Sequence, residues 1–325
     1  MKLKRAVITI ATGKRVYFDM AIALARSYLL WNKNADIEFF IVTDRLDELP
    51  KDLAKISIMR FKPGELGVGF SMKLKLDQIA PAEQTLFIDA DCLCFGPLES
   101  VFDRFNGHAV SVIGGSISSG QWFGDIAKIC TLFSVSEIPK FNGGIYYLEP
   151  GAKATSVYEK ARDLEHKYDE LGLVRLRGSA NDELLMSIAM AVEGCTGIED
   201  DGTIHGDVGS CPKLVSLDVL SGQACLYNPD PPDPLYRDWY PARKIRPLVV
   251  HCLGDFTVKW PYRAEEKLLQ LVMGRQIPSL ISRLWVNVTF RYPSMCKEYL
   301  REKLRPIYHA FFGVRAVKKT GRIDF

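Results

Sequence analysis

The sequence lacks the motifs of several large protein classes. None of its eight cysteines forms a CxxC pair, which argues against a zinc ribbon or a thioredoxin-like site. Neither GxxxxGKS nor GxxxxGKT is present, so a P-loop is excluded. The Gly67-Val68-Gly69 stretch lacks the third glycine of a dinucleotide-binding fingerprint, because position 72 is Met. A nucleotide ligand would therefore need a different kind of site.

Long apolar segments are also absent. No stretch approaches the ~18 apolar residues of a membrane span. The apolar run in the first residues, MKLKRAVITIATG, is too short for the core of a signal peptide. Cysteines scattered over 325 residues suggest buried thiols in a reducing compartment. We therefore expect a cytoplasmic protein, in which the Asn287-Val288-Thr289 glycosylation sequon is idle.

Neither sign of charge dominates the whole chain, whose formal net charge is only +3. This balance argues against a polycation built to bind nucleic acid. Residues 283–325 differ, because ten Lys or Arg and three Asp or Glu give them +7 and leave −4 for the rest. Aromatic residues are interleaved with these charges. We expect a main domain over 1–277 and a basic, aromatic extension over 278–325 that attaches peripherally to an anionic membrane surface.

Two alternatives to membrane attachment stay open for this extension. It can form a helix that packs its aromatic residues on the rest of the protein, since Tyr299, Leu300 and Leu304 are spaced for packing. Nucleic-acid binding is the weaker alternative, because no recognition motif accompanies the charge.

Strand-like and helix-like segments alternate along the chain. The predicted strands are 5–11, 37–42, 85–88, 109–113, 144–148 and 248–252. The predicted helices are 17–31, 72–79, 154–168 and 182–192, and the Gly- and Ser-rich residues 114–124 are expected to form a loop. This alternation predicts an α/β fold with a mostly parallel sheet flanked by helices.

The most informative segment is Leu86-Phe87-Ile88-Asp89-Ala90-Asp91. A buried strand delivers Asp89 and Asp91 at positions i and i+2, which share one face of an extended backbone. Two like charges repel each other there unless a cation lies beside them. Mg²⁺ and Mn²⁺ prefer carboxylate oxygens and often also bind phosphate oxygens of a substrate. The alternative is a pair of solvated acids in a turn.

Three further segments carry groups suited to ligand binding, each with a plain structural alternative. His251 ends a predicted strand and can bind a metal ion through neutral imidazole, or can simply be a satisfied structural histidine. Asn142, Gly143 and Gly144 allow a ligand to approach closely, or form a simple turn. Asn181-Asp182-Glu183 opens an apolar helix, where an N-cap and the helix dipole explain all three residues without catalysis.

Together these segments resemble the GT-A glycosyltransferases of family 8, which include glycogenin and bacterial lipopolysaccharide galactosyl- and glucosyltransferases. The resemblance covers about residues 5–262. It rests most on the FIDAD segment, on FNGG and on the HCLG…KW segment, and the separation of Lys73 from Asp89 also suits the family. Two departures are a longer loop before Tyr17 and two extra residues between Gly254 and Lys259.

The resemblance implies a retaining hexosyltransferase that uses a nucleotide sugar, usually a UDP-sugar, with Mn²⁺ or Mg²⁺. It implies that the metal ligands are Asp89, Asp91 and His251. It implies donor-binding roles for Thr12, Tyr17, Lys73, Asp89, Asn142, Gly143, Gly144, Gly254 and Lys259. It also implies catalytic roles for Asp182 and Glu183 at the sugar and for Lys259 at the diphosphate, with Glu183 where many members carry Gln.

Several features of this interpretation stay open at the level of sequence. A non-catalytic sugar-nucleotide or glycan-binding protein can use the same scaffold, because a fold does not fix a function. A nucleotidyltransferase has a similar sheet, although Ala11-Thr12-Gly13-Lys14-Arg15 is a short match to its Gly-rich loop. The acceptor can be a glycan, a lipid-linked sugar or a protein. Trp122, Phe123 and residues 200–210 either line its pocket or belong to the core and turns.

Overall fold

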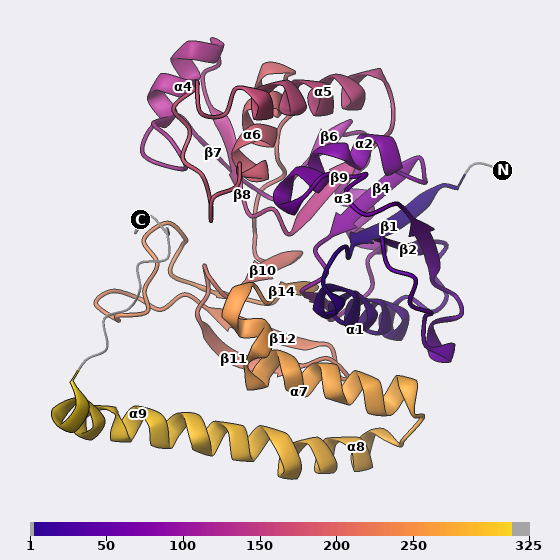
Figure 1. Cartoon of the computed structure of the whole chain (residues 1–325), viewed down its shortest axis with the longest axis vertical. Coiled ribbons are helices and arrows are strands. Elements are labelled where there is room, and N and C mark those ends of the chain that lie inside the picture. The colour runs from indigo at the N-terminus through magenta and orange to yellow at the C-terminus, as the bar shows by residue number, and fades with distance from the viewer. Residues whose placement is uncertain (1–2, 314–325) are drawn as a thin grey trace.

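A six-stranded sheet forms the centre of the computed structural model, which describes residues 3–313 (Figure 1). Its strand order is β3-β2-β1-β4-β9-β6. The first four strands of this order are parallel, whereas β9 runs antiparallel to β4 and to β6. The strands are β1 Arg5–Ile10, β2 Glu38–Thr43, β3 Ser57–Arg60, β4 Gln84–Ile88, β6 Val110–Ser111 and β9 Ile145–Leu148. The predicted α/β fold with a mostly parallel sheet is confirmed.

The central strands are buried on both faces because their alternate residues enter two different hydrophobic clusters. Leu86 and Ile88 of β4 lie in one cluster, and Phe87 between them lies in the other. β1 and β9 alternate in the same way, as the two-residue period of a strand requires. Burial on both faces explains why β4 reads as a continuous apolar run and why the polar residue after it, Asp89, marks its end.

Helices cover both faces of the sheet. α1 and α3 contribute residues to the first cluster, and α4, α5 and α6 contribute residues to the second (Figure 1). These helices are α1 Arg15–Trp31, α3 Glu99–Phe105, α4 Ile126–Phe133, α5 Ala152–His166 and α6 Asp182–Val192. α2 Leu76–Ile79 continues the 3₁₀ helix η2 Gly69–Lys75, and η1 Lys51–Leu53 is a further 3₁₀ turn.

Three smaller sheets complete the described strands. β14 Val249–His251 lies between β10 His205–Asp207 and β5 Cys92–Cys94, and it pairs His251 with Asp207 on one side and with Cys92 on the other. This small sheet brings two distant segments to the residues that follow β4. The other strands are β7 Gly114–Ile117, β8 Ile138–Phe141, β11 Lys213–Asp218, β12 Gln223–Tyr227 and β13 Lys244–Ile245.

Residues after His251 form helical elements along one side of the molecule (Figure 1). They are η3 Gly254–Val258, α7 Trp260–Leu269, the π-helical turn η4 Gln270–Gly274, α8 Ser279–Val286, the π-helical turn η5 Asn287–Arg291 and α9 Tyr292–Phe312. None of the described helices is long and apolar enough to cross a membrane. The basic residues Arg315, Lys318, Lys319 and Arg322, together with Asp324, lie outside the described residues.

Several elements differ from those predicted from sequence. The helix predicted over 72–79 is divided between η2 and α2, and the loop predicted over 114–124 begins with strand β7. Short strands such as β5, β8 and β10 have only three or four residues, too few to show a two-residue period. By contrast, the helix predicted over 182–192 has the predicted bounds, because Asn181 caps its first turn.

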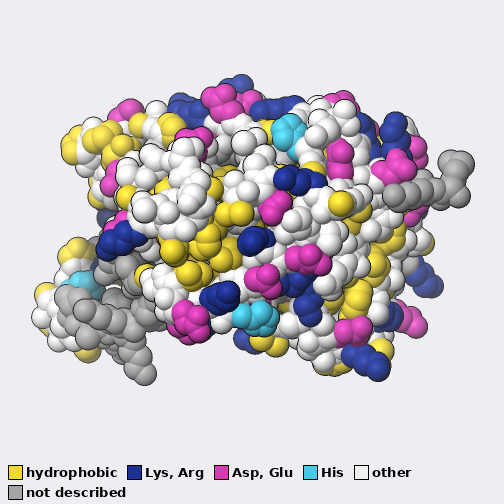
Figure 2. All heavy atoms as spheres, turned by 90° about the horizontal axis from the view of Figure 1, so that it is seen from above, with side chains coloured by type: hydrophobic (Ala, Val, Ile, Leu, Met, Phe, Trp, Pro, Cys, Tyr) yellow, Lys and Arg dark blue, Asp and Glu magenta, His cyan; other side chains and the backbone are white. Residues whose placement is uncertain are grey.

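Charges of both signs are interspersed on the face seen from the α4 and α5 end of the molecule (Figure 2). Lys and Arg side chains alternate there with Asp and Glu around a central group of hydrophobic side chains. No extended basic surface covers this face, which agrees with the small net charge of the chain.

Candidate active site

The two aspartates that follow β4 are held by backbone hydrogen bonds from two different directions. The Asp89 N–H donates to the Gly144 carbonyl at 2.9 Å, which joins the end of β4 to the turn before β9. The Cys252 N–H donates to the Asp91 carbonyl at 3.0 Å, which joins the same segment to the end of β14. The predicted juxtaposition of Asp89, Asp91, Asn142–Gly144 and His251 is therefore present at the carboxyl edge of the sheet.

The imidazole of His251 connects the aspartates to Asn142. Its Nε2 lies 3.0 Å from Asp91 Oδ1 and 3.8 Å from Asp89 Oδ2. Its Nδ1 lies 2.8 Å from Asn142 Oδ1, which also accepts a hydrogen bond from Gly144 N at 3.0 Å. Because that amide oxygen can only accept, Nδ1 is the donor, and in the neutral ring the lone pair is on Nε2. Asn142 thus orients His251 in the way that partners of metal-binding histidines do.

Two carboxylate oxygens, Asp89 Oδ2 and Asp91 Oδ1, lie near His251 Nε2, and the three atoms form a possible donor set for a metal ion. Asp91, Cys92 and His251 place possible ligand atoms within 4.8 Å of one another. Burial raises the pKa of the Cys92 thiol well above its ordinary value, which disfavours the thiolate form that binds metal ions. Asp89 Oδ2 is the better third donor on the side of His251 that faces the carboxylates. A set of this kind fits Mn²⁺ or Mg²⁺ better than a soft metal ion.

Lys73 joins the aspartate segment to the glycine turn. Its ammonium donates to Asp89 Oδ2 at 2.7 Å and to the Gly143 carbonyl at 2.8 Å, and lies 3.6 Å from Asp182. Burial acts to lower the pKa of Lys73, but the carboxylates of Asp182 and Asp89 outweigh it and raise the pKa. The ammonium therefore stays charged and fixes three segments of the site to one another.

Asp182 and Glu183 open α6 and point into the same cluster. Asp182 Oδ2 accepts a hydrogen bond from the Tyr146 hydroxyl at 2.7 Å, and Glu183 Oε1 accepts one from Gly143 N at 2.7 Å. Burial, followed by the neighbouring charge of Asp182, raises the pKa of Glu183 to about 7. Asn181 acts as the N-cap of α6, since its Oδ1 accepts from Leu184 N at 2.9 Å. The N-cap alternative is therefore confirmed for Asn181, whereas Asp182 and Glu183 also contact Tyr146 and Gly143 in the cluster.

The cluster carries more negative than positive charge. Its acids are Asp89, Asp91, Asp182 and Glu183, and its basic groups are Lys73 and His251. Burial acts to lower the pKa of His251, but Asp91 and Asp89 outweigh it and raise the pKa to about 9. In the metal-free protein a proton on His251 therefore partly offsets the carboxylates. A divalent cation can replace that proton and balance the charge more fully.

The side-chain contacts of the remaining predicted donor-binding residues are outside the hydrogen-bond network of the cluster. Thr12 follows β1, and its hydroxyl donates to Met72 Sδ at 2.9 Å. Tyr17 lies exposed in the first turn of α1. Gly254 has φ +60° and begins η3, and Lys259 ends that turn with its ammonium 4.3 Å from the centre of the Phe256 ring. The two extra residues between Gly254 and Lys259 are thus accommodated by a 3₁₀ turn.

His205, predicted only as part of a possible acceptor loop over 200–210, lies beside the cluster. Its ring is buried 5.8 Å from that of His251, and its Nε2 has no hydrogen-bond partner among residues 3–313. Burial, reinforced by the neighbouring His251 charge, lowers the pKa of His205 to about 4. Only strand pairing between β10 and β14 brings the two rings together, so no local sequence signal could have found this contact.

Trp122 and Phe123, considered above for the acceptor pocket, are buried in the second hydrophobic cluster. The Trp122 ring lies 6.2 Å from that of Phe141, in the strand that leads to Asn142. These aromatic residues therefore belong to the core, as one of the two alternatives predicts, and Trp122 packs near the strand that precedes the glycine turn.

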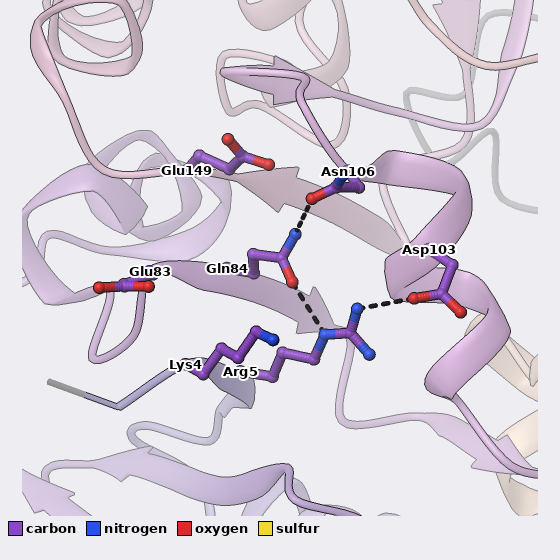
Figure 3. Close-up of a pocket in the computed structure, with 7 residues that line it drawn as sticks. All are labelled: Lys4, Arg5, Glu83, Gln84, Asp103, Asn106 and Glu149. Atoms are coloured by element: carbon purple, nitrogen blue, oxygen red, sulfur yellow. Dashed lines mark hydrogen bonds and ion pairs between the residues drawn. The ribbon is translucent and has the colours of Figure 1, made fainter.

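A polar pocket of about 440 Å³ lies at the opposite edge of the sheet, where β1 and β4 begin (Figure 3). Four of its seven lining side chains are hydrogen-bonded to one another. Arg5 donates to Gln84 at 2.8 Å and to Asp103 at 2.6 Å, and Gln84 donates to Asn106 at 2.7 Å. This pocket is separate from the carboxylate–histidine cluster and contains none of the predicted site residues.

No family model matches the sequence, and no curated protein matches it either. Among solved structures, the chain is similar to a galactosyltransferase, LgtC, in complex with donor and acceptor sugar analogs. The identity is 14%, the match covers 84% of this chain and 97% of LgtC, and the TM-score is 0.52. An active-site mutant of LgtC gives 14% identity, coverage of 77% and 87%, and a TM-score of 0.50.

The protein has the GT-A glycosyltransferase fold. The resemblance drawn from the FIDAD, FNGG and HCLG segments is confirmed at the level of the fold. In this GT-A fold, the carboxylate–histidine cluster lies outside the carboxyl ends of the parallel strands, where open α/β sheets bind their ligands. The roles of the individual residues stay proposals.

Proposed function

We propose that the protein is a retaining glycosyltransferase that moves a hexose from a nucleotide sugar, UDP-linked, to a glycan, lipid-linked or protein acceptor. The observation that carries the proposal is the cluster of four acids, Asp182 buried and the other three half-buried, with Lys73 and His251 at the carboxyl edge of a GT-A sheet. Like charges placed close together destabilise the folded protein unless a bound cation offsets them, so the cluster favours a role in binding a charged ligand.

The donor set supports a divalent metal ion, Mn²⁺ or Mg²⁺, as cofactor. Asp89, Asp91 and His251 would hold it, with Asn142 fixing the orientation of the imidazole. When bound, such an ion supplies neutralisation of the charge that develops on a departing diphosphate. Lys259, at the start of α7, would add a second positive charge for the same group.

The other residues of the cluster shape the place where the sugar would lie. Gly143 and Gly144 carry no side chains into it, and Lys73 holds the Gly143 carbonyl and Asp89 in place. Thr12, Tyr17 and Gly254 border the same edge and are proposed to contact the nucleotide. These groups are fixed before a substrate arrives, and that preorganisation favours catalysis.

Retention of configuration requires a nucleophile or an attack on the face that the leaving group departs from. The bond from the anomeric carbon to the diphosphate oxygen breaks and leaves its electron pair on that oxygen. A new bond forms to the acceptor oxygen, whose proton passes to the departing diphosphate or through it to water. Asp182 and Glu183 are the carboxylates proposed to lie beside the anomeric carbon, where their charge stabilises the positive character that develops there.

An assay of product release across a panel of UDP-sugars tests this proposal. Free UDP should appear with Mn²⁺ and disappear when the metal ion is removed by a chelator. Asp91→Asn and His251→Ala should each lower turnover more than about 100-fold. Loss of a residue that hydrogen-bonds to a metal ligand already lowers activity or metal affinity about 10–100-fold, and loss of the ligand itself should cost at least as much. Asp103→Asn and His108→Ala lie outside the cluster and serve as matched controls that should keep normal turnover.

Two other outcomes would point to the alternatives. Release of pyrophosphate in place of UDP would identify a nucleotidyltransferase. Tight binding of a UDP-sugar without turnover, across acceptors of all three kinds, would identify a non-catalytic binding protein. Near-normal turnover of Asp91→Asn with Mn²⁺ present would show that the metal assignment is wrong.

A further inference from the structure

Residues 279–312, here called the C-terminal helix, form a continuous run of α8, η5 and α9 along one side of the molecule (Figure 1). Its large apolar side chains are unusually exposed. Trp285 is 62% exposed, Phe311 is 79% exposed, and α9 contains no buried residue. The exposed members are Leu280, Ile281, Leu284, Trp285, Val288, Tyr292, Met295, Tyr299, Leu300, Leu304, Ile307, Tyr308, Phe311 and Phe312. The alternative in which the aromatic residues pack on the rest of the protein holds for Phe290, which packs beside α7, but not for these exposed side chains.

The opposite side of α8 and η5 attaches the C-terminal helix to the body. Val286 is buried in a small cluster with Ala264 and Leu268 of α7. Arg283 pairs with Asp218, and Arg291 pairs with Glu265. Because one side is fixed in this way, the apolar side chains on the other side stay presented to the surroundings.

Basic side chains border the apolar surface of α9. Lys297, Arg301 and Arg305 recur at intervals of four residues, so they form one ridge along the helix. Lys303 adds a fourth cation, whereas the acids of α9 are Glu298 and Glu302. Glu298 accepts a hydrogen bond from Trp260 Nε1 at 3.0 Å and so faces the body. The outer surface of α9 is therefore apolar, aromatic and basic.

We propose that the C-terminal helix lies in the headgroup region of an anionic membrane, with its apolar side chains directed toward the acyl chains. Amphipathic helices with aromatic and aliphatic residues beside Lys and Arg bind such surfaces in this orientation. Tyr and Trp side chains are suited to the membrane–water boundary, because they combine an apolar ring with a polar group. Residues 279–312 hold six Lys or Arg and two Glu, a net charge of +4, whereas residues 1–278 carry −4. The helix is therefore the part of the described chain that an anionic surface attracts.

A second copy of the chain is a less suitable occupant of this surface. Two such helices side by side would place their Lys and Arg ridges near each other, which is unfavourable. Nucleic acid is also less suitable, because the large exposed apolar groups would gain no burial in a phosphate backbone. The membrane assignment depends on the C-terminal helix alone and does not require the proposed catalysis.

Vesicle flotation with the full chain tests the assignment. The protein should float with phosphatidylcholine vesicles that contain about 30 mol% phosphatidylglycerol, and should stay at the bottom with phosphatidylcholine alone. Flotation should weaken when salt rises from about 50 mM to about 500 mM, because screening shortens the range of the charge attraction. No nucleotide sugar or metal ion is needed, so this result is independent of any transferase activity.

Paired variants separate the two contributions. Trp285→Ser with Tyr299→Ser should lower the partition coefficient more than about tenfold through lost apolar contact. Lys297→Gln, Arg301→Gln and Arg305→Gln should each lower it about fivefold on anionic vesicles. Leu132→Ser and Lys128→Gln on the exposed side of α4 are the matched controls and should bind normally. Circular dichroism establishes that each variant is folded.

Three results would overturn the assignment. The first is wild-type protein that fails to float with anionic vesicles at low salt. The second is normal flotation of both the aromatic and the charge variants. The third is a stable dimer, seen by light scattering, that dissociates in the Trp285→Ser variant and does not float.

Discussion

At the scale of single residues, the site depends on the hydrogen bonds of Asn142 and on the absence of a side chain at Gly144. Asn142 Oδ1 accepts from both Gly144 N and His251 Nδ1, and that shared acceptor leaves Nε2 facing the aspartates. Gly144 leaves space for the neighbouring side chains because it has no Cβ atom. A Cβ atom there would lie 2.5 Å from His251 Nδ1, 2.9 Å from His205 Nε2 and 3.1 Å from Asn142 Oδ1. These rings and the amide can approach one another only because residue 144 has no side chain.

Gly144→Ala is therefore expected to displace His251 from Asn142. We expect a loss of about 1–3 kcal/mol in the free energy of unfolding, as for other overpacked sites. Mn²⁺ affinity should fall about 10–100-fold, the usual cost of losing a partner of a metal-binding histidine. Urea unfolding and Mn²⁺ titration measure the two effects. Gly115→Ala on β7, where a Cβ meets nothing within 4 Å, is the matched control. Unchanged Mn²⁺ binding in Gly144→Ala would contradict the role given to the Asn142–His251 bond.

At the scale of elements, a buried ion pair joins η5 to α7. Glu265 is 1% exposed, and its carboxylate accepts from Arg291 and from Val219 N at 2.8 Å. Burial raises the pKa of Glu265 to about 7, although Val219 N–H and Arg291 oppose it. Because this value lies above the ordinary pKa of a glutamate, the folded protein binds the proton more tightly than the unfolded chain. This group therefore makes the protein less stable as pH rises toward 7 from the acidic side.

Arg291→Met should destabilise the protein by about 3 kcal/mol at pH 8, because it leaves a buried carboxylate without its cation. The loss should be smaller at pH 6, where Glu265 can take up a proton. Thermal unfolding at the two pH values measures the difference. Glu265→Gln introduced together with Arg291→Met should recover part of the stability and remove the pH dependence. Arg263→Met, in a more exposed pair with Glu266 on the same helix, should cost less than about 1 kcal/mol. An Arg291→Met loss that is equal at both pH values would contradict this account.

At the scale of the whole molecule, the two hydrophobic clusters share one sheet. Neighbouring residues of β1, β4 and β9 enter opposite clusters, so neither cluster can unfold without exposing strands that the other needs. The carboxylate–histidine cluster lies at the edge of these same strands, and His251 joins it through the smaller sheet. A ligand bound there contacts elements from both halves of the chain and should stabilise them together.

A UDP-sugar at about 100 times its dissociation constant should raise the free energy of unfolding by about 2.7 kcal/mol, and Mn²⁺ should increase this effect. Scanning calorimetry should show a single transition that moves as a whole to higher temperature, because the two clusters unfold together. The Asp91→Asn variant should lose most of the Mn²⁺-dependent part of the shift. No shift with any UDP-sugar in the presence of Mn²⁺ would exclude this class of donor.

The sequence by itself determined the α/β fold and the groups gathered at the carboxyl edge. Apolar runs in β1 and β4 report burial on both faces, and polar residues directly after them mark ligand-facing strand ends. Asp89, Asp91, Asn142 and His251 could be found in this way because each follows or precedes a recognisable strand. Helix α6 was predictable at both ends because its cap and its apolar period are local properties.

Only the tertiary structure decided which of these groups touch and which other groups join them. The pairing of β14 with β10 brings His205 beside His251, although these residues are far apart in sequence, and the path of η2 brings the Lys73 ammonium to Asp89. The tertiary structure also decided the exposure of the C-terminal helix, because the spacing of its apolar residues is compatible with either packing or exposure. α7 buries Val286 of α8, whereas α9 meets α7 through the hydrogen bond from Trp260 to Glu298 and contains no buried residue. Contacts between distant segments depend on strand order and helix placement, which no local pattern encodes.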